Sequence, residues 1–148
     1  MKKKNKSPEK SKNRNKKMIL KAGLALKNEY YLEASWIISA YLEKRLKNIL
    51  KKVEIQKAGI DNLFDQNIKR IKHLHLTTQN PLLTEHFSIQ MIDELRAWKN
   101  QRNEVMKDML VRHVSGDRME RLANEGVRIL KEWNARHKDF KIHIRNTE

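Results

Sequence analysis

The sequence predicts an all-α fold, a compact up-and-down bundle of four to five helices that follows a disordered basic N-terminal tail. Apolar residues recur at helical spacing through several long segments. Only four glycines and two prolines interrupt the 148 residues, and Gly59, Pro81 and Gly116 fall where helices would begin or end. The chain has no cysteine, but it is long enough to bury a core without disulfides or metals.

The first three helices follow from apolar spacing and from the residues that punctuate it. Residues 18–27 predict a short first helix, and residues 29–57 predict a long second one. Gly59 suits the end of the second helix, and Asp61 suits the cap of a third that runs to about His75. One face of the second helix carries Ala34, Ile38, Leu42, Leu46, Ile49 and Val53, and the third is lined by Leu63, Phe64, Ile68 and Ile71.

A fourth helix is expected over residues 81–111. Asn80 is a favourable N-cap, and Pro81 suits the first turn because its missing N–H has no partner there. Their order therefore marks the start of a helix.

The fifth helix is expected to follow the turn at residues 115–117 and to end near residue 136. Asp117 and Glu120 form a variant of the capping box at its start. Gly126 lies on the apolar face, where a glycine costs about 1 kcal/mol of helix stability relative to alanine. We therefore expect another helix to approach closely at this position. The apolar face carries Met119, Leu122, Gly126, Leu130 and Trp133.

Positive charge is concentrated at the N-terminus. Residues 2–17 hold nine lysines and arginines and a single acid, Glu9, which gives +8 of the net +15 and leaves +7 for the rest of the chain. A segment with almost no apolar residues cannot offset its ordering entropy by burial, so residues 1–17 are expected to be disordered. From its charge alone, this segment can equally well be a solubilising extension or a tail that attracts nucleic acid. Because the rest of the chain is also basic, we favour a polyanionic partner.

One residue breaks the apolar pattern of the fourth helix. Arg102 lies on the stripe formed by Met91, Leu95, Trp98, Val105 and Met109. A charge is costly to bury unless it is paired or faces a partner. Two explanations are open: an internal pair with an acid such as Glu33 or Glu43, or a phosphate-facing cluster in which the guanidinium stabilises a phosphodiester oxygen. A polar face beside the stripe carries Lys99, Asn103 and Lys107.

Other chemistries find little support in the sequence. His73 and His75 are two residues apart on a helix and face different directions, and the other histidines are scattered, so no metal site or cofactor is expected. Glycine-rich phosphate loops and hydrolase serine elbows are missing. No apolar run is long enough to cross a bilayer and no secretory signal is recognisable, so we expect a cytoplasmic protein without membrane attachment. Core packing is expected of Trp36, Trp98 and Trp133.

The motif in the fourth helix resembles that of the HEPN superfamily of small helical domains. The hallmark of that family is an arginine, a polar residue that is often asparagine, and a histidine four to six positions after the arginine. The stretch Arg102-Asn103-Glu104-Val105-Met106-Lys107 matches the first two positions and has Lys107 in the histidine position. Trp98 is similar to the aromatic residue common before the motif. The likeness extends to residues 30–34, 42–47 and 123–126.

The resemblance covers residues 18–136 and implies three parts of the chain. Residues 1–17 form the tail, residues 18–136 the HEPN-like domain, and residues 137–148 a C-terminal arm. Within the arm, residues 140–144 alternate with period two, which predicts a short strand or an extended segment.

Membership of this family would imply a bundle that is often dimeric, with two copies of the motif facing a shared cleft. Active members are metal-independent endoribonucleases of toxin–antitoxin, antiviral and RNA-processing systems, in which the arginine and histidine promote attack of the ribose 2′-hydroxyl on the adjacent phosphate. By this likeness Arg102, Asn103 and Lys107 would be the catalytic residues. Lysine ordinarily has a pKa of about 10.4 and exchanges protons poorly near neutral pH. The resemblance therefore implies RNA binding with a degenerate or weak ribonuclease centre.

We accordingly expect a homodimeric RNA-binding protein of a bacterial toxin–antitoxin or defence system, with an antitoxin or another protein as a further partner. The alternative is a helical interaction or dimerisation module that binds no nucleic acid. The residues expected to contact RNA are Lys99, Arg102, Lys107, Lys2, Lys3, Lys4, Arg14, Lys16 and Lys17.

Overall fold

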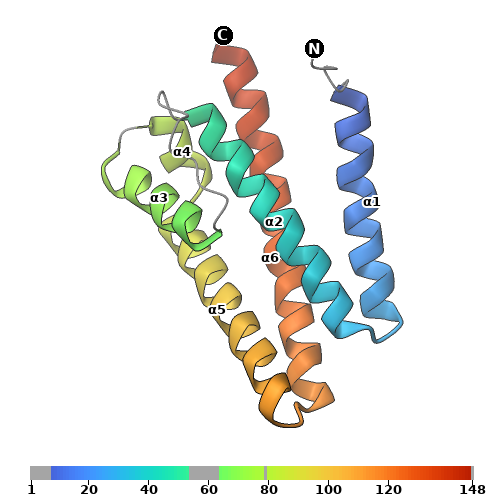
Figure 1. Ribbon diagram of the computed structural model, residues 1–148. Coiled ribbons are helices and arrows are strands. Elements are labelled where there is room, and N and C mark those ends of the chain that lie inside the picture. The colour runs from blue at the N-terminus through green and yellow to red at the C-terminus, as the bar shows by residue number, and fades with distance from the viewer. Residues whose placement is uncertain (1–7, 54–63, 79, 148) are drawn as a thin grey trace, which may run out of the picture.

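The computed structural model describes residues 8–53, 64–78 and 80–147, and all regular structure in these ranges is helical. The four long helices run alternately up and down, while two shorter ones lie in the connection between the second and third long helices (Figure 1). The predicted all-α bundle is thereby confirmed. The elements are α1 (Pro8–Lys27), α2 (Tyr31–Val53), α3 (Phe64–Leu76), α4 (Pro81–His86), α5 (Ile89–Val111) and α6 (Gly116–Thr147).

Helices α2 and α6 pack against each other at the centre of the bundle, with α1 and α5 on either side (Figure 1). The apolar face predicted for α2 is buried, apart from Val53, which is only partly covered. Burial of these side chains removes apolar surface from water and supplies the main stabilisation of the bundle. The core of α2 consists of Ala34, Ile38, Tyr41, Leu42, Leu46, Ile49 and Leu50.

The close helix approach predicted at Gly126 is confirmed. The indole ring of Trp98 in α5 lies directly on this glycine of α6, where an added Cβ would stand 2.7 Å from ring atom Cζ2. The indole N–H donates a hydrogen bond of 2.8 Å to the carbonyl oxygen of Leu122. Glycine is therefore required by the ring that packs across the helix.

Helix α1 begins earlier than the sequence predicted. Residues 8–17, expected to belong to a disordered tail, lie within α1, whereas residues 1–7 lie outside the described residues. Ala22 and Ala25 are buried, and Met18 and Ile19 pack against the core, so the C-terminal half of α1 is anchored on the bundle. Lysine is a good helix former, and the helix continues from this anchor toward its N-terminus.

The expected fourth helix is divided in two. Asn80 caps α4 as predicted, its side chain accepting a hydrogen bond of 3.1 Å from the Leu83 N–H. However, Phe87 has an extended backbone, and Ser88 caps a new helix by accepting a hydrogen bond of 3.1 Å from the Met91 N–H. Phe87 is fully buried and stacks on Trp133 of α6 at 5.2 Å between ring centroids. The break therefore lets an aromatic side chain enter the core.

The short strand or extended segment predicted within residues 140–144 is wrong, because α6 continues without interruption to Thr147. His137 and Phe140 are buried, and Phe140 packs against Phe87 with ring centroids 5.4 Å apart. Tertiary contact thus outweighs the period-two alternation of residues 140–144. At the other end of α6, the capping hydrogen bond comes from Ser115, whose hydroxyl oxygen accepts from the Arg118 N–H at 3.2 Å, instead of from the expected capping box.

Two residues expected in the core are exposed. Trp36 is 56 % exposed, whereas Trp98 and Trp133 are each 1 % exposed. Trp36 lies two residues from both Ala34 and Ile38, which places it on the opposite side of α2 from the buried face. Met109 is 40 % exposed in the last turn of α5, beyond Val105, the last buried residue of its stripe.

Candidate functional site

Arg102 lies half-buried on α5 at the edge of the apolar stripe. Its Nε atom is inaccessible to solvent and forms no hydrogen bond with any described residue. Burial lowers the pKa of the guanidinium, and the negative charge of Glu43 on α2 acts in the opposite direction. Glu33 and Glu43, the two acids considered as partners, form no ion pair with Arg102. The internal pair considered from the sequence is therefore not formed by these two residues.

Of the three polar residues beside Arg102, one forms an ion pair within the fold and two are exposed to solvent. Lys99 is half-buried and pairs with Asp65 of α3 at 3.2 Å. Burial acts to raise the pKa of Asp65, but hydrogen bonds from Lys69 and Lys99 outweigh it, so that this pKa lies below its usual value. Lys99 is thus engaged within the fold. Asn103 and Lys107 are exposed.

The structure describes only some of the cations that were expected to contact RNA from the N-terminal tail. Arg14, Lys16 and Lys17 lie on α1 and are exposed. Lys2, Lys3 and Lys4 lie outside the described residues. The predicted site residues that the structure describes therefore come from two different helices of the bundle, α1 and α5.

A cavity of about 710 Å³ lies between α5 and α6, close to the motif helix. Its lining mixes charges, because Glu104 and Glu125 stand among three arginines. Two of the arginines are engaged by acids: Arg118 pairs with Asp108 at 2.6 Å, and Arg128 pairs with Glu125 at 2.6 Å. The cavity is consequently close to neutral and is poorly suited to an anion. Arg102 does not line it.

A second cavity, of about 390 Å³, lies where α1, α2 and the C-terminal half of α6 meet. We call it the basic cavity. Its described lining contains five lysines and arginines and no aspartate or glutamate. The start of α1 and the end of α6 lie at the same end of the bundle (Figure 1). The residues that line the basic cavity are Asn15, Lys16, Ile19, Arg45, Asn134, His137, Lys138, Lys141, Ile142 and Arg145.

Arg45 is the most unusual residue of the basic cavity, because it is only 6 % exposed. Its Nε donates a hydrogen bond of 2.9 Å to the Tyr41 hydroxyl, and its Cζ lies 5.0 Å from the centre of the Tyr41 ring. The Tyr41 hydroxyl in turn donates to Asn134 Oδ1 at 2.6 Å. No described acid forms an ion pair with Arg45. A buried guanidinium held in place by neutral groups keeps most of its charge available to a ligand.

His137 of α6 is the second buried polar group of the basic cavity. It is 1 % exposed, and its Nε2 has no hydrogen-bond partner among the described residues. Burial lowers the pKa of His137 to about 3, with further lowering by the positive charges of Arg45, Lys141 and Lys52. The imidazole is therefore neutral at physiological pH, and it offers one nitrogen as a donor and the other as an acceptor.

Arg45 and His137 were not predicted from the sequence, although both break an apolar pattern as Arg102 does. Arg45 continues the buried face of α2 through Ile38, Leu42 and Ile49, and His137 lies between Trp133 and Phe140 on the buried face of α6. The same signal was thus present in α2 and α6. Of the residues expected to contact RNA that the structure describes, only Lys16 lies at this cavity.

No protein-family model, curated protein or solved structure matches this chain. The likeness to the HEPN superfamily therefore depends only on the sequence stretches that resemble it. In the described part of the chain, no helix combines the length and the apolar character that are needed to cross a bilayer.

Proposed function

We propose that this protein binds RNA through the phosphate backbone, and that the basic cavity receives one of the phosphate groups. The observation that carries the proposal is that the guanidinium of Arg45 is buried and has no ion pair with a described acid, in a cavity lined by four further cations. A buried charge without a countercharge is costly, and an anion that enters the cavity would offset this cost. Phosphate suits the site because arginine can donate to two of its oxygens at once.

An extended polyanion is favoured over an isolated phosphate ion by the distribution of charge outside the cavity. Arg14 and Lys17 are exposed on α1, which contributes Lys16 to the cavity. The whole chain carries a net charge of +15, which would steer a nucleic acid toward it and release condensed counterions on binding. The resemblance of residues 102–107 to the HEPN motif points in the same direction.

Arg102 would take a second phosphate on α5. The assignment is supported because Arg102 is only half-buried and forms no ion pair with a described acid. We expect Arg102→Ala to lower RNA affinity without lowering the thermal midpoint of unfolding. A large loss of thermal stability with unchanged RNA binding would instead assign Arg102 a structural role.

The basic cavity is tested by fluorescence anisotropy of a labelled single-stranded RNA over a range of salt concentrations. Lys138 and Arg145 are exposed and line the cavity, so their joint replacement by alanine should leave the fold intact. We expect the slope of log K against log salt to fall by about 0.7 for each phosphate that the variant no longer neutralises. Joint replacement of Lys131 and Arg136, exposed cations of α6 that do not line the cavity, is the charge-matched control.

A second variant separates ligand binding from folding. Arg45→Met removes the buried charge and keeps most of the aliphatic volume, so the free energy of unfolding should stay constant or rise. RNA affinity should fall. If Arg45→Met and the control double variant bind RNA equally well, the basic cavity is not the binding site. If the intact protein has no affinity even at low salt, RNA is not the ligand.

Weak ribonuclease activity forms part of the proposal through the motif at Arg102, Asn103 and Lys107. The test is incubation of the protein with labelled RNA in the presence of a chelator. Equal cleavage by the intact protein and by Lys107→Ala would remove Lys107 from the mechanism.

The alternative function, an interaction or dimerisation module, is favoured by one observation. Leu110 and Val111 at the end of α5 are 86 % and 78 % exposed and adjoin the partly exposed Met109. Exposed apolar side chains gathered at one helix end can mark a protein interface. Sedimentation velocity together with the RNA titration separates the two functions, because a stable dimer without RNA affinity at low salt would favour the module.

A further inference from the structure

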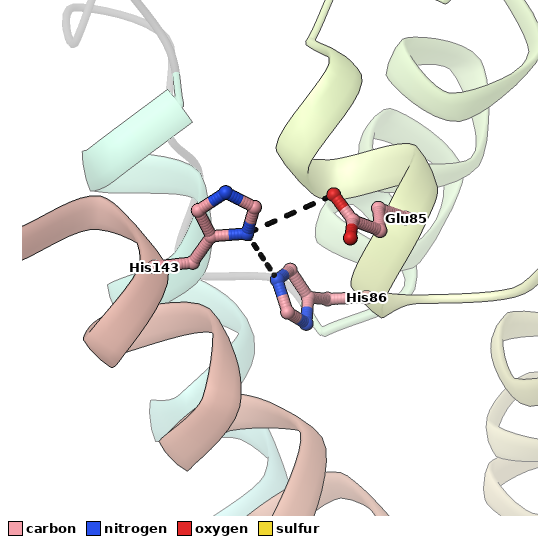
Figure 2. A group of neighbouring side chains, drawn as sticks. All are labelled: Glu85, His86 and His143. Atoms are coloured by element: carbon pink, nitrogen blue, oxygen red, sulfur yellow. Dashed lines mark hydrogen bonds and ion pairs between the residues drawn. The ribbon is translucent and has the colours of Figure 1, made fainter. Parts of the chain in front are cut away.

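Three potential metal ligands meet between α4 and the C-terminal part of α6, and none of them lines the basic cavity. Glu85 and His86 are the last two residues of α4, and His143 lies on α6 (Figure 2). His86 Nε2 is 3.0 Å from His143 Nδ1, and the same His143 nitrogen is 3.7 Å from Glu85 Oε2. One ligand atom from each of the three residues lies within 4.8 Å of the other two.

The spacing of these atoms suits a small divalent cation. Zinc binds imidazole nitrogen at about 2.0–2.1 Å and carboxylate oxygen at about 2.0–2.2 Å, so two donors of a tetrahedral site are about 3.3 Å apart. The distances of 3.0 and 3.7 Å lie on either side of this value. The Glu85 side chain is 63 % exposed, so a rotation that brings its oxygen closer meets little resistance.

The histidines are held in place by the fold. The ring of His86 packs edge-on against Phe140, with centroids 5.9 Å apart, and Phe140 is fully buried. His143 lies one helical turn after Phe140 on the same helix, and its ring meets that of His86 at 83°. Partly buried rings with a preset orientation lose little freedom when they bind an ion, and rigid support of this kind favours metal affinity.

We propose that Glu85, His86 and His143 bind a zinc ion. Two imidazoles and one carboxylate are a donor set typical of zinc, whereas calcium and magnesium prefer sites made of oxygen alone. Three protein ligands leave a coordination position for water. The bound ion would join the end of α4 to the C-terminal part of α6, segments that are 57 residues apart in the chain. This inference does not depend on RNA binding.

The test is titration of the full chain with Zn²⁺ by calorimetry and with Co²⁺ by visible absorption, which reports the coordination geometry. We expect one site with Zn²⁺, and a thermal midpoint that rises with Zn²⁺ concentration and returns to its starting value after chelation. His143→Ala should weaken zinc binding by at least about tenfold, since loss even of residues that support metal ligands has effects of this size. Glu85→Gln, at an exposed position, should also weaken it and should leave the fold unchanged.

The matched control is His73→Ala, which removes an exposed histidine of α3 outside the cluster. This variant should bind Zn²⁺ as the intact protein does. The proposal is overturned if the intact protein binds no Zn²⁺, or if His143→Ala, Glu85→Gln and His73→Ala all bind it with the affinity of the intact protein. In either case the two histidines form only a hydrogen bond of 3.0 Å with each other.

Discussion

Substitution of Gly126 by alanine tests the packing of α5 on α6. An added Cβ would stand 2.7 Å from Cζ2 and 2.9 Å from Cε2 of Trp98, well inside van der Waals contact. The indole ring cannot move away freely, because its N–H donates to the Leu122 carbonyl oxygen at 2.8 Å and the side chain is 1 % exposed. Either the ring shifts and strains this hydrogen bond, or the two helices separate.

The expected loss of stability follows from three contributions. Overpacking of a well-filled core costs about 1–3 kcal/mol. Strain on a buried hydrogen bond costs about 1 kcal/mol more. Alanine in place of glycine within a helix returns about 1 kcal/mol. We therefore expect Gly126→Ala to lower the free energy of unfolding by about 1–3 kcal/mol.

The assay is urea-induced unfolding followed by circular dichroism, with Gly23→Ala as the matched control. Gly23 lies within α1, and an added Cβ there would meet nothing within 4 Å. Only the helix preference then remains, so Gly23→Ala should raise the free energy of unfolding by about 0.5–1 kcal/mol. If both variants are stabilised to the same extent, the close contact between Trp98 and Gly126 does not exist.

Three further predictions concern titration, capping and a buried hydroxyl. His137 binds a proton below about pH 6.5 when the protein is unfolded but only below about pH 3 when it is folded. The free energy of unfolding should therefore decrease as the pH is lowered from about 6.5 to about 3, by up to about 1.4 kcal/mol per pH unit. His137→Gln should flatten this dependence in urea titrations at a series of pH values. Ser88→Ala removes the acceptor for the Met91 N–H and should cost about 1 kcal/mol, measured by urea unfolding, and an unchanged midpoint would contradict the cap. Tyr41→Phe leaves the buried Nε of Arg45 without its acceptor and should cost about 1–3 kcal/mol in the same assay, whereas full stability would show that the hydroxyl is dispensable.

Much of the fold could be predicted because the relevant signals are local. The buried face of α2 follows from apolar residues three and four positions apart, and the start of α4 follows from Asn80 and Pro81. Gly126 also revealed a close helix contact, although not the residue that makes it. The buried face of α2 and the start of α4 depend on neighbours within about two helical turns, whereas the residue that contacts Gly126 lies on another helix.

The errors arose where distant residues meet. The sequence near Phe87 is compatible with an unbroken helix, but Trp133 and Phe140 accept the Phe87 ring in the core, and the helix breaks there. The same contacts hold residues 137–147 in α6, although the pattern of residues 140–144 predicted an extended arm. Burial of a few large aromatic rings outweighed a short-range periodicity.

The candidate site also combines features that local sequence patterns indicate with features that depend on contacts between distant residues. The pattern of apolar residues identified Arg102 as a charge in an apolar stripe, and it contained the same signal for Arg45 and His137. It could not indicate that Arg45 and His137 line one cavity, or that His143 reaches His86 across 57 residues. The buried face of α2 and the cap at Asn80 depend on residues close to each other in the chain, and so the amino-acid order was sufficient to predict them. Cavities and ligand clusters depend on which helix faces pack together, and only the folded bundle brings those faces into contact.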